Sequence, residues 1–205
     1  MNILAIGAHP DDIELGCAGT LLKYTRSGDN VYLLVLSDGS KGGDCSVRKL
    51  EQIEASNIMG AKELIWGDWN DTEFDVTNEN VEYIENIIKR LQPDEIYVNY
   101  FDDSHQDHRA LAQCVISATR YCKRVLFYED YTSQNFEPNI FVDISEVLNE
   151  KFRLMKTFKS QLEKNTSDEP TMLENIRSVA RFRGFQAKIN FAEGFMPLRY
   201  IKLIN

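Results

Sequence analysis

The segment NILAIGAHPDD, residues 2–12, contains the strongest indication of the fold in this sequence. It begins with a short, continuous apolar run, Asn2 to Ile6, of the kind that suits a strand buried on both faces. One imidazole and two adjacent carboxylates follow where the strand should end. We therefore expect a buried parallel strand here, with the chemistry of the protein directly after it.

A second buried strand is predicted at Val31 to Leu36, which is again short and continuously apolar. Between the two strands, Glu14 to Ser27 has apolar residues at helical spacing and closes at Gly28. The connection is long enough for the right-handed crossover that parallel strands require. The first part of the chain is therefore predicted to form a β-α-β unit.

The alternation of strands and helices continues, and it predicts a single three-layer, Rossmann-like α/β domain over residues 1–205 with a mainly parallel sheet. Asn165 to Pro170 is a polar break too short to be an interdomain linker. Further helices are expected at Ser46 to Met59, around Val81 to Leu91, from His108 to Thr119, at Glu146 to Phe158 and at Thr171 to Phe182. Further strands are expected at Glu63 to Trp66, Glu95 to Phe101, Val125 to Tyr128, Ile140 to Ile144 and, as a final edge strand, Tyr200 to Ile204.

Composition narrows the class of partner and the cellular location. The formal net charge of -9 argues against a nucleic-acid partner, which needs a basic surface. The apolar N-terminal run is interrupted by His9 and Asp11, so neither a signal peptide nor a membrane span is expected and a cytoplasmic location is the default. The four cysteines have no metal-site spacing and are expected to be reduced thiols.

A second polar cluster, Asp102 to His108, also follows an apolar run, and the two clusters together hold all three histidines. Loops at the carboxyl ends of parallel strands lie at one edge of the sheet, so the two clusters should meet. A catalytic zinc-like ion takes three imidazole or carboxylate ligands and a water, and His9, Asp12 and His108 would form such a set. We therefore expect both clusters to surround one divalent metal.

Each cluster alone has an ordinary structural interpretation. His-Pro-Asp-Asp can be a helix-capping turn, because Asp is favoured at a helix start. His-x-x-His is usually a solvated helix face. The two clusters together, each at a strand end and with no other histidine in the chain, favour the metal site.

At these residues the chain resembles the PIG-L/LmbE-like family of zinc-dependent N-acetylglucosamine de-N-acetylases. The motifs are Ala8-His9-Pro10-Asp11-Asp12 and His105-Gln106-Asp107-His108, and the pair is quite specific in this order and separation. Lesser similarities run nearly end to end: Glu14, Gly16, Gly19 and Thr20; Arg48, Glu51, Ala55 and Gly60; Asp71 and Thr72; Lys159 to Gln161; and Ala192 to Phe195.

The resemblance implies a ligand set and a general base. His9, Asp12 and His108 would hold Zn²⁺, although another divalent metal such as Fe²⁺ is compatible with the same ligands. Asp11 would take a proton from a metal-activated water, which attacks the acetamide carbonyl. The implied activity is therefore removal of an acetyl group from an N-acetylglucosamine-type conjugate, a small-molecule partner.

The resemblance also implies roles for His105 and Asp107. A protonated His105 would stabilise the tetrahedral oxyanion. Asp107 would hold His105 in its useful orientation and favour its charged form, whereas the sequence alone also allows Asp107 to orient any nearby ring.

Substrate contacts are expected from Arg48 and Asp71. The guanidinium of Arg48 suits bidentate contact with sugar hydroxyls, although it could equally be a surface cation on an acidic helix. Asp71 matches the family's substrate-loop Asp, with Asn70 as an alternative. The loop Ser37 to Gly43 departs from the family's Thr-x-Gly-Glu pattern, so its substrate contacts are open.

Two other functions remain as alternatives. A metal phosphoesterase also needs a metal and an acidic base, but it often uses two metals with more carboxylates than this chain offers. A non-catalytic nucleotide-binding module would need G-x-G-x-x-G where this chain has His-Pro-Asp-Asp. The identity of the sugar conjugate and the oligomeric state, including a homo-oligomer, are left open by the sequence.

Overall fold

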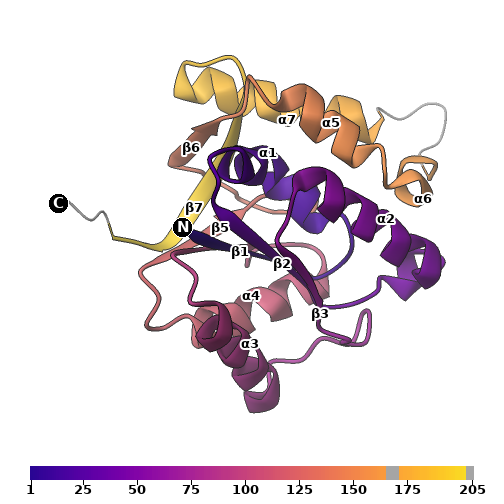
Figure 1. Ribbon diagram of the computed structural model, residues 1–205, viewed down its shortest axis with the longest axis vertical. Helices are drawn as coiled ribbons and strands as arrows, with labels where there is room; N and C mark the ends of the chain where they lie inside the picture. Colours follow the sequence, from indigo (N-terminus) through magenta and orange to yellow (C-terminus); the bar gives the residue numbers. More distant parts are fainter. Residues whose placement is uncertain (165–170, 202–205) are drawn as a thin grey trace.

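The computed structural model describes residues 1–164 and 171–201, which form a seven-stranded sheet between two layers of helices (Figure 1). The strands are β1 (Asn2–Gly7), β2 (Asn30–Val35), β3 (Glu63–Trp66), β4 (Glu95–Asn99), β5 (Arg124–Tyr128), β6 (Ile140–Asp143) and β7 (Ala192–Tyr200). The helices are α1 (Asp12–Arg26), α2 (Cys45–Met59), α3 (Asn78–Leu91), α4 (Gln106–Ala118), α5 (Leu148–Met155), α6 (Lys159–Leu162) and α7 (Met172–Ala187), with a 3₁₀ turn, η1, at Ser40–Gly42.

The sheet has the strand order β3-β2-β1-β4-β5-β7-β6. Strands β1 to β5 are parallel, whereas β7 is antiparallel to both of its neighbours, β5 and β6. The predicted mainly parallel α/β sheet is thereby confirmed. The order reverses between β1 and β4, and the loops after adjacent strands at such a switch point form the usual ligand crevice of a doubly wound sheet.

Each face of the sheet is covered by its own hydrophobic core. On one face, α1, α2, α5 and α7 pack through residues such as Ile13, Leu21 and Met59 (Figure 1). On the other face, α3 and α4 pack through Ile84 and Leu111. The central strands are buried on both sides, which explains why their sequences are continuously apolar and do not alternate.

The last strand differs from its prediction. The expected edge strand began at Tyr200, whereas β7 ends there and lies inside the sheet between β5 and β6. Gly194 and Pro197 interrupt its apolar pattern, and Pro is normally excluded from central strands. The register shift between Val125 and Leu126, opposite Pro197, is a bulge of the type that admits a proline. Residues 202–205 lie outside the described part of the chain.

The C-terminal helices also differ in extent from their predictions. The predicted helix at Glu146 to Phe158 is shorter in the structure, and the separate helix α6 follows it. Helix α7 begins after Thr171, whose hydroxyl accepts a hydrogen bond from the Glu174 amide in a capping box. The predicted polar break at Asn165 to Pro170 lies outside the described residues. None of the helices in the described ranges combines the length and apolar character that a membrane crossing needs.

Candidate functional site

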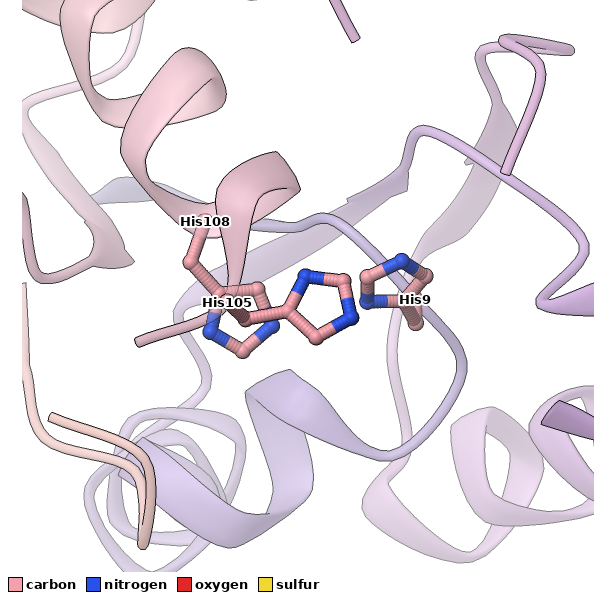
Figure 2. A group of neighbouring side chains, drawn as sticks. All are labelled: His9, His105 and His108. Carbon is pink, nitrogen blue, oxygen red and sulfur yellow. The ribbon is translucent and has the colours of Figure 1, made fainter. Parts of the chain in front are cut away.

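The two predicted clusters meet at the carboxyl ends of β1 and β4. His9 follows β1, while His105 and His108 stand at the start of α4, and the three rings face one another (Figure 2). The ring centroid of His105 lies 4.7 Å from that of His9 and 4.7 Å from that of His108. The predicted convergence of these histidines is therefore present in the structure.

Asp12 is the residue that links the two clusters. Its Oδ2 accepts hydrogen bonds from the backbone amides of Ala8 and His9, both at 2.9 Å, and from Nδ2 of Asn99 at 3.2 Å. The same oxygen lies 3.3 Å from His108 Nε2 and 3.6 Å from His9 Nδ1. The turn after β1 thus fixes the carboxylate between the two imidazoles.

The two distances from Asp12 Oδ2 are those of neighbouring ligands on one ion, but the structure does not close the third side of the predicted set, between His9 and His108. Ligand atoms about 2.0 to 2.1 Å from a tetrahedral ion lie roughly 3.4 Å apart, close to both distances from Asp12 Oδ2. Potential ligand atoms also gather within 4.8 Å in three overlapping groups, and none of these contains His9, Asp12 and His108 together. The groups are His9, His105 and His108; His9, Asp71 and Asp107; and Asp12, His108 and Asp130.

The electrostatics of this cluster favour positive charge. Burial alone would lower the pKa of His9, but hydrogen bonds with Asp107, Asp12 and Asp71 outweigh it and raise that pKa to about 12. Burial likewise opposes the charge of His108, yet Asp12 raises its pKa to about 10. Conversely, the charge of His108 holds the pKa of Asp12 well below its usual range despite burial. A cation is therefore the natural occupant of the cluster.

The far nitrogen of His9 is held by carboxylates. His9 Nε2 lies 3.1 Å from Asp107 Oδ2 and 3.2 Å from Asp71 Oδ1, which leaves Nδ1 facing Asp12. Asp107 is itself fixed by the amide of Thr72, which donates to Oδ2 at 2.7 Å. A carboxylate on the second nitrogen of a metal-binding imidazole sets the tautomer and orientation of its ring.

This contact corrects the expected partner of Asp107. The carboxylate of Asp107 was predicted to orient His105, but it contacts His9, and Asp107 reaches the His105 ring through its backbone amide. The reason is that Asp107 faces inward in the first turn of α4, toward the loop that contains Thr72.

His108 has a similar arrangement on its far side. Its Nδ1 lies 3.2 Å from Asp103 Oδ2, although the pair is not aligned well enough for a hydrogen bond. The other oxygen of Asp103 accepts from the amide of His105 at 2.8 Å. Asp103 therefore stands behind His108 as Asp107 stands behind His9.

His105 is the N-cap of α4. Its Nδ1 accepts the backbone N–H of Asp107 at 3.2 Å, so the ring proton belongs on Nε2. Burial, and after it the charges of His9 and His108, lower the pKa of His105. Both observations favour a neutral ring that donates from Nε2, whereas the charged form implied by the resemblance stays a prediction.

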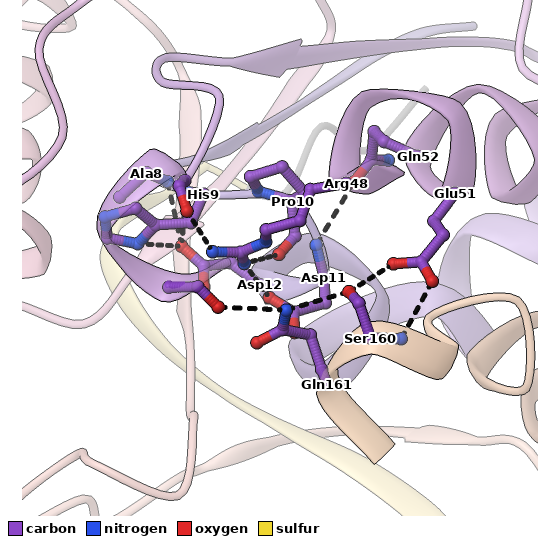
Figure 3. A network of polar contacts seen from close by, with 12 residues as sticks. Ala8, His9, Pro10, Asp11, Asp12, Arg48, Glu51, Gln52, Ser160 and Gln161 are labelled. Atoms are coloured by element: carbon purple, nitrogen blue, oxygen red, sulfur yellow. Dashed lines mark hydrogen bonds and ion pairs between the residues drawn. The ribbon is translucent and has the colours of Figure 1, made fainter. Parts of the chain in front are cut away.

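Asp11 is buried in the turn before α1 and is held by α2 (Figure 3). Its backbone adopts a left-handed φ of 92°, and its amide donates to Gln52 Oε1 at 3.1 Å. Burial raises the pKa of Asp11 to about 7, even though the nearby Arg48 guanidinium lowers it. A carboxyl with this pKa suits proton transfer near neutral pH.

Arg48 is committed to contacts within the protein. Its guanidinium donates to the carbonyl oxygens of Gly39 and Pro10, both at 2.8 Å, and lies 3.5 Å from Asp11 Oδ1. Gly39 has a φ of 67°, and a Cβ there would lie 2.2 Å from Arg48 Nη1, so the glycine makes room for the guanidinium. The predicted contact of Arg48 with substrate stays a prediction.

Asp71 lies at the boundary between the histidine cluster and a polar cavity of about 310 Å³. Its Oδ2 accepts the amide of Lys41 at 2.7 Å, while Oδ1 faces His9. Trp69 lines the same cavity, and its ring packs edge-on against Phe74 with centroids 4.9 Å apart. The substrate role of Asp71 also stays a prediction.

Several residues of the site were not singled out from the sequence. Asp103 lies in the cluster Asp102 to His108, and Asp130 closely follows β5. Their position after a strand is the feature of the sequence that could have identified them. Asn99 is the last residue of β4 and carries no such signal, although it bonds to both Ala8 and Asp12. Gln52 stands on α2 within an ordinary helical pattern.

Comparisons with known proteins identify the family and the fold. The sequence model of the family PIG-L, GlcNAc-PI de-N-acetylase, matches residues 4–119. Diacetylchitobiose deacetylase of Thermococcus kodakarensis is 31% identical over 233 residues, covering 96% of this chain and 83% of that protein. The conserved protein TT1542 of Thermus thermophilus superposes with a TM-score of 0.88 at 24% identity, covering 98% of this chain and 96% of that one.

The fold alone does not determine the activity. GalB, the 4-carboxy-2-hydroxymuconate hydratase of Pseudomonas putida KT2440, has a TM-score of 0.82 at 20% identity, covering 100% of this chain and 98% of that one. The assignment therefore rests on sequence similarity over more than half of the chain. By that similarity, the protein belongs to the PIG-L family of GlcNAc-PI de-N-acetylases.

Proposed function

We propose that this protein is a metal-dependent hydrolase that removes the acetyl group from an N-acetylated amino-sugar conjugate of the N-acetylglucosamine type. The observation that carries the proposal is the position of Asp12 between His9 and His108, with Asp11 directly beside it. The name of the Thermococcus relative, a diacetylchitobiose deacetylase, supports the same reaction and the same class of sugar.

The proposed metal ligands are His9, Asp12 and His108. We propose Zn²⁺ because imidazole and carboxylate donors suit it, and Fe²⁺ is the alternative for the same donors. When bound, such an ion supplies a Lewis acid that polarises a carbonyl and lowers the pKa of a water. Asp107 and Asp103 would fix the orientation of the two imidazoles from behind.

The proposed chemistry divides proton transfer and charge stabilisation between two residues. The carboxylate of Asp11 takes a proton from the attacking water while the water oxygen bonds to the acetamide carbon. His105 donates its Nε2–H to the oxygen that becomes negative, a role for which a neutral imidazole is sufficient. Asp11 then returns the proton to the nitrogen as the carbon–nitrogen bond breaks, and acetate and a free amine leave.

The remaining roles concern the substrate and the surroundings of the site. We propose that Asp71 contacts sugar hydroxyls from the edge of the polar cavity. We also propose that Arg48 holds the loop at Gly39 in place and lowers the pKa of Asp11. A single domain over residues 1–205, a small-molecule partner without nucleic acid and a cytoplasmic location stay predictions from the sequence, and the oligomeric state stays open.

A direct test measures acetate release from N-acetylglucosamine conjugates by the purified protein, with metal content determined in parallel. We expect acetate release that is lost on chelation and restored by Zn²⁺ or Fe²⁺, with one ion per chain. Phosphate release from phosphate esters with two ions per chain would favour the phosphoesterase alternative instead. Nucleotide binding without any hydrolysis would favour a binding module.

A further inference from the structure

A second cavity, of about 290 Å³, begins at the candidate metal site and extends between α1 and α7. Asp130 connects the two, because it lines this cavity and its carboxylate also groups with Asp12 and His108 within 4.8 Å. The exposed ring of Tyr131 stands at the same end. The cavity therefore adjoins the candidate metal site at Asp130.

Part of the wall of this cavity is apolar. Leu15 of α1 lines one side, and Met172, Ile176 and Val179 of α7 line the other. The three side chains from α7 are thus all uncharged and apolar. A wall of this composition removes apolar surface from water and offers few partners for hydroxyl groups.

The charged residues that line the cavity are largely neutralised in pairs. Lys151 Nζ bonds to Glu193 Oε1 at 2.7 Å, and both side chains are almost fully buried. Glu129 accepts two hydrogen bonds from Arg183, at 2.7 and 2.6 Å. Apart from these pairs, the lining has Lys164, which bonds to Gln161 Oε1 at 2.7 Å, and Asp130, whose pKa burial raises to about 8.

We propose that this cavity binds an apolar aglycone carried by the amino-sugar substrate, an inference that rests on the proposed deacetylation. An engineered cavity of about 150 Å³ holds a benzene molecule, so 290 Å³ has room for a phenyl group with substituents or an alkyl chain of similar volume. Taking a carboxylate out of water against the apolar part of the wall costs free energy, which argues against an anionic aglycone. The polar cavity at Asp71, with Asp38, Asp68 and Glu73 in its lining, is unsuited to an apolar group.

The first test compares three glycosides of N-acetylglucosamine that differ only in the aglycone: methyl, hexyl and 5-carboxypentyl. Each fully buried methylene contributes about fourfold to binding, so partial burial of the hexyl chain should raise kcat/KM by roughly tenfold or more over the methyl glycoside. The carboxypentyl glycoside should lose most of this advantage. Equal rates for methyl and hexyl, or a preference for the carboxylate, would overturn the proposal.

Substitutions in the cavity wall test whether the rate advantage of the hexyl glycoside arises in this cavity. Val179 is 43% exposed, so Val179→Asp changes the wall without placing a charge in the core. We expect it to bring the ratio of hexyl to methyl rates close to one, and Val179→Ala, which keeps a good helix former, to reduce the ratio by a smaller factor. Phe185→Asp is the matched control, because Phe185 is exposed on the same helix and does not line this cavity. A ratio that falls equally in the control would contradict the assignment.

A binding measurement separates this proposal from the proposed function. Hexyl glucoside has no acetamide to cleave, and calorimetric titration should show it binding at least tenfold more tightly than methyl glucoside, with the difference removed by Val179→Asp. If methyl N-acetylglucosaminide is deacetylated but hexyl glucoside has no advantage in binding, the aglycone site is wrong and the deacetylase stands. If hexyl glucoside binds in this way but no glycoside is deacetylated, the proposed function fails and the apolar site stands.

Discussion

His9 Nε2 lies 3.1 Å from Asp107 Oδ2, across 98 residues of sequence. The contact turns Nδ1 of His9 toward Asp12. Asp107 therefore orients His9, a candidate metal ligand, whereas the resemblance implied that it orients His105. The consequence is that a change at Asp107 should affect metal binding before it affects the chemical step.

Asp107→Asn tests this relationship. Loss of such a supporting carboxylate typically weakens metal affinity by about 10- to 100-fold, so we expect that decrease in competition titrations with a chelator. Activity at saturating metal should recover most of its wild-type value. Asp102→Asn, in the loop before α4, is the control and should bind metal normally. An unchanged affinity for the metal together with a large fall in kcat would support the predicted contact of Asp107 with His105 instead.

His105 and His108 should differ in what their loss removes. His108→Ala is expected to lose the metal, whereas His105→Ala should keep it and lose about 100- to 1000-fold in kcat, the usual effect of removing one oxyanion donor. His105→Ala also removes the cap of α4, which costs about 1 kcal/mol of stability, and His105→Asn restores a capping group. Metal analysis and single-turnover rates measure both effects. Metal loss in His105→Ala would mean that the two roles are exchanged.

Asp11 should govern the acidic side of the pH profile. The carboxyl must be ionised to accept a proton, and its pKa of about 7 means that kcat/KM falls as the pH decreases below that value. A cation beside Asp12 would lower this pKa further, so the acidic limb is expected at or below about pH 7. Asp11→Asn should bind metal and lose most turnover.

Arg48→Gln provides the matching perturbation of the same limb. The guanidinium lowers the pKa of Asp11, so its removal should move the acidic limb of kcat/KM to higher pH. Lys49→Gln, a neighbouring cation on α2 with no described contact to Asp11, should leave the limb where it is. A limb that stays fixed in Arg48→Gln would show that another group titrates.

Glu14 should make the stability of the protein depend on pH. Burial raises its pKa from 4.5 to about 8, so the folded state holds this proton more tightly than the unfolded chain does. The stabilisation from that proton is fully present below about pH 4.5 and is lost as the pH rises through about 8. Between these limits we expect wild type to lose about 2 to 4 kcal/mol relative to Glu14→Gln, measured by urea unfolding at each pH. The exposed Glu54→Gln is the control and should show no such difference.

Much of the fold and part of the site could be predicted because they depend on local pattern. Runs such as Asn2 to Ile6 are apolar without alternation, and only a strand covered on both faces has that pattern at this length. His9 and His108 each follow a predicted parallel strand, and this placed them at the same edge of the sheet. The interior strand β7 was misplaced because Pro197 interrupts its apolar pattern, and a bulge in β7 opposite Val125 and Leu126 makes the proline acceptable.

The sequence by itself determined which residues stand at the sheet edge, because strand direction and chain connectivity decide that much. The tertiary structure alone decided which nitrogen of each ring faces which carboxylate, as in the contacts of His9 with Asp12 and Asp107. It also decided that His105 caps α4 through Nδ1 and that Asp11 is buried beside Arg48. The physical reason is that ring orientation and pKa depend on groups brought within about 4 Å by the docking of α4 and α2, and no local pattern encodes those distances.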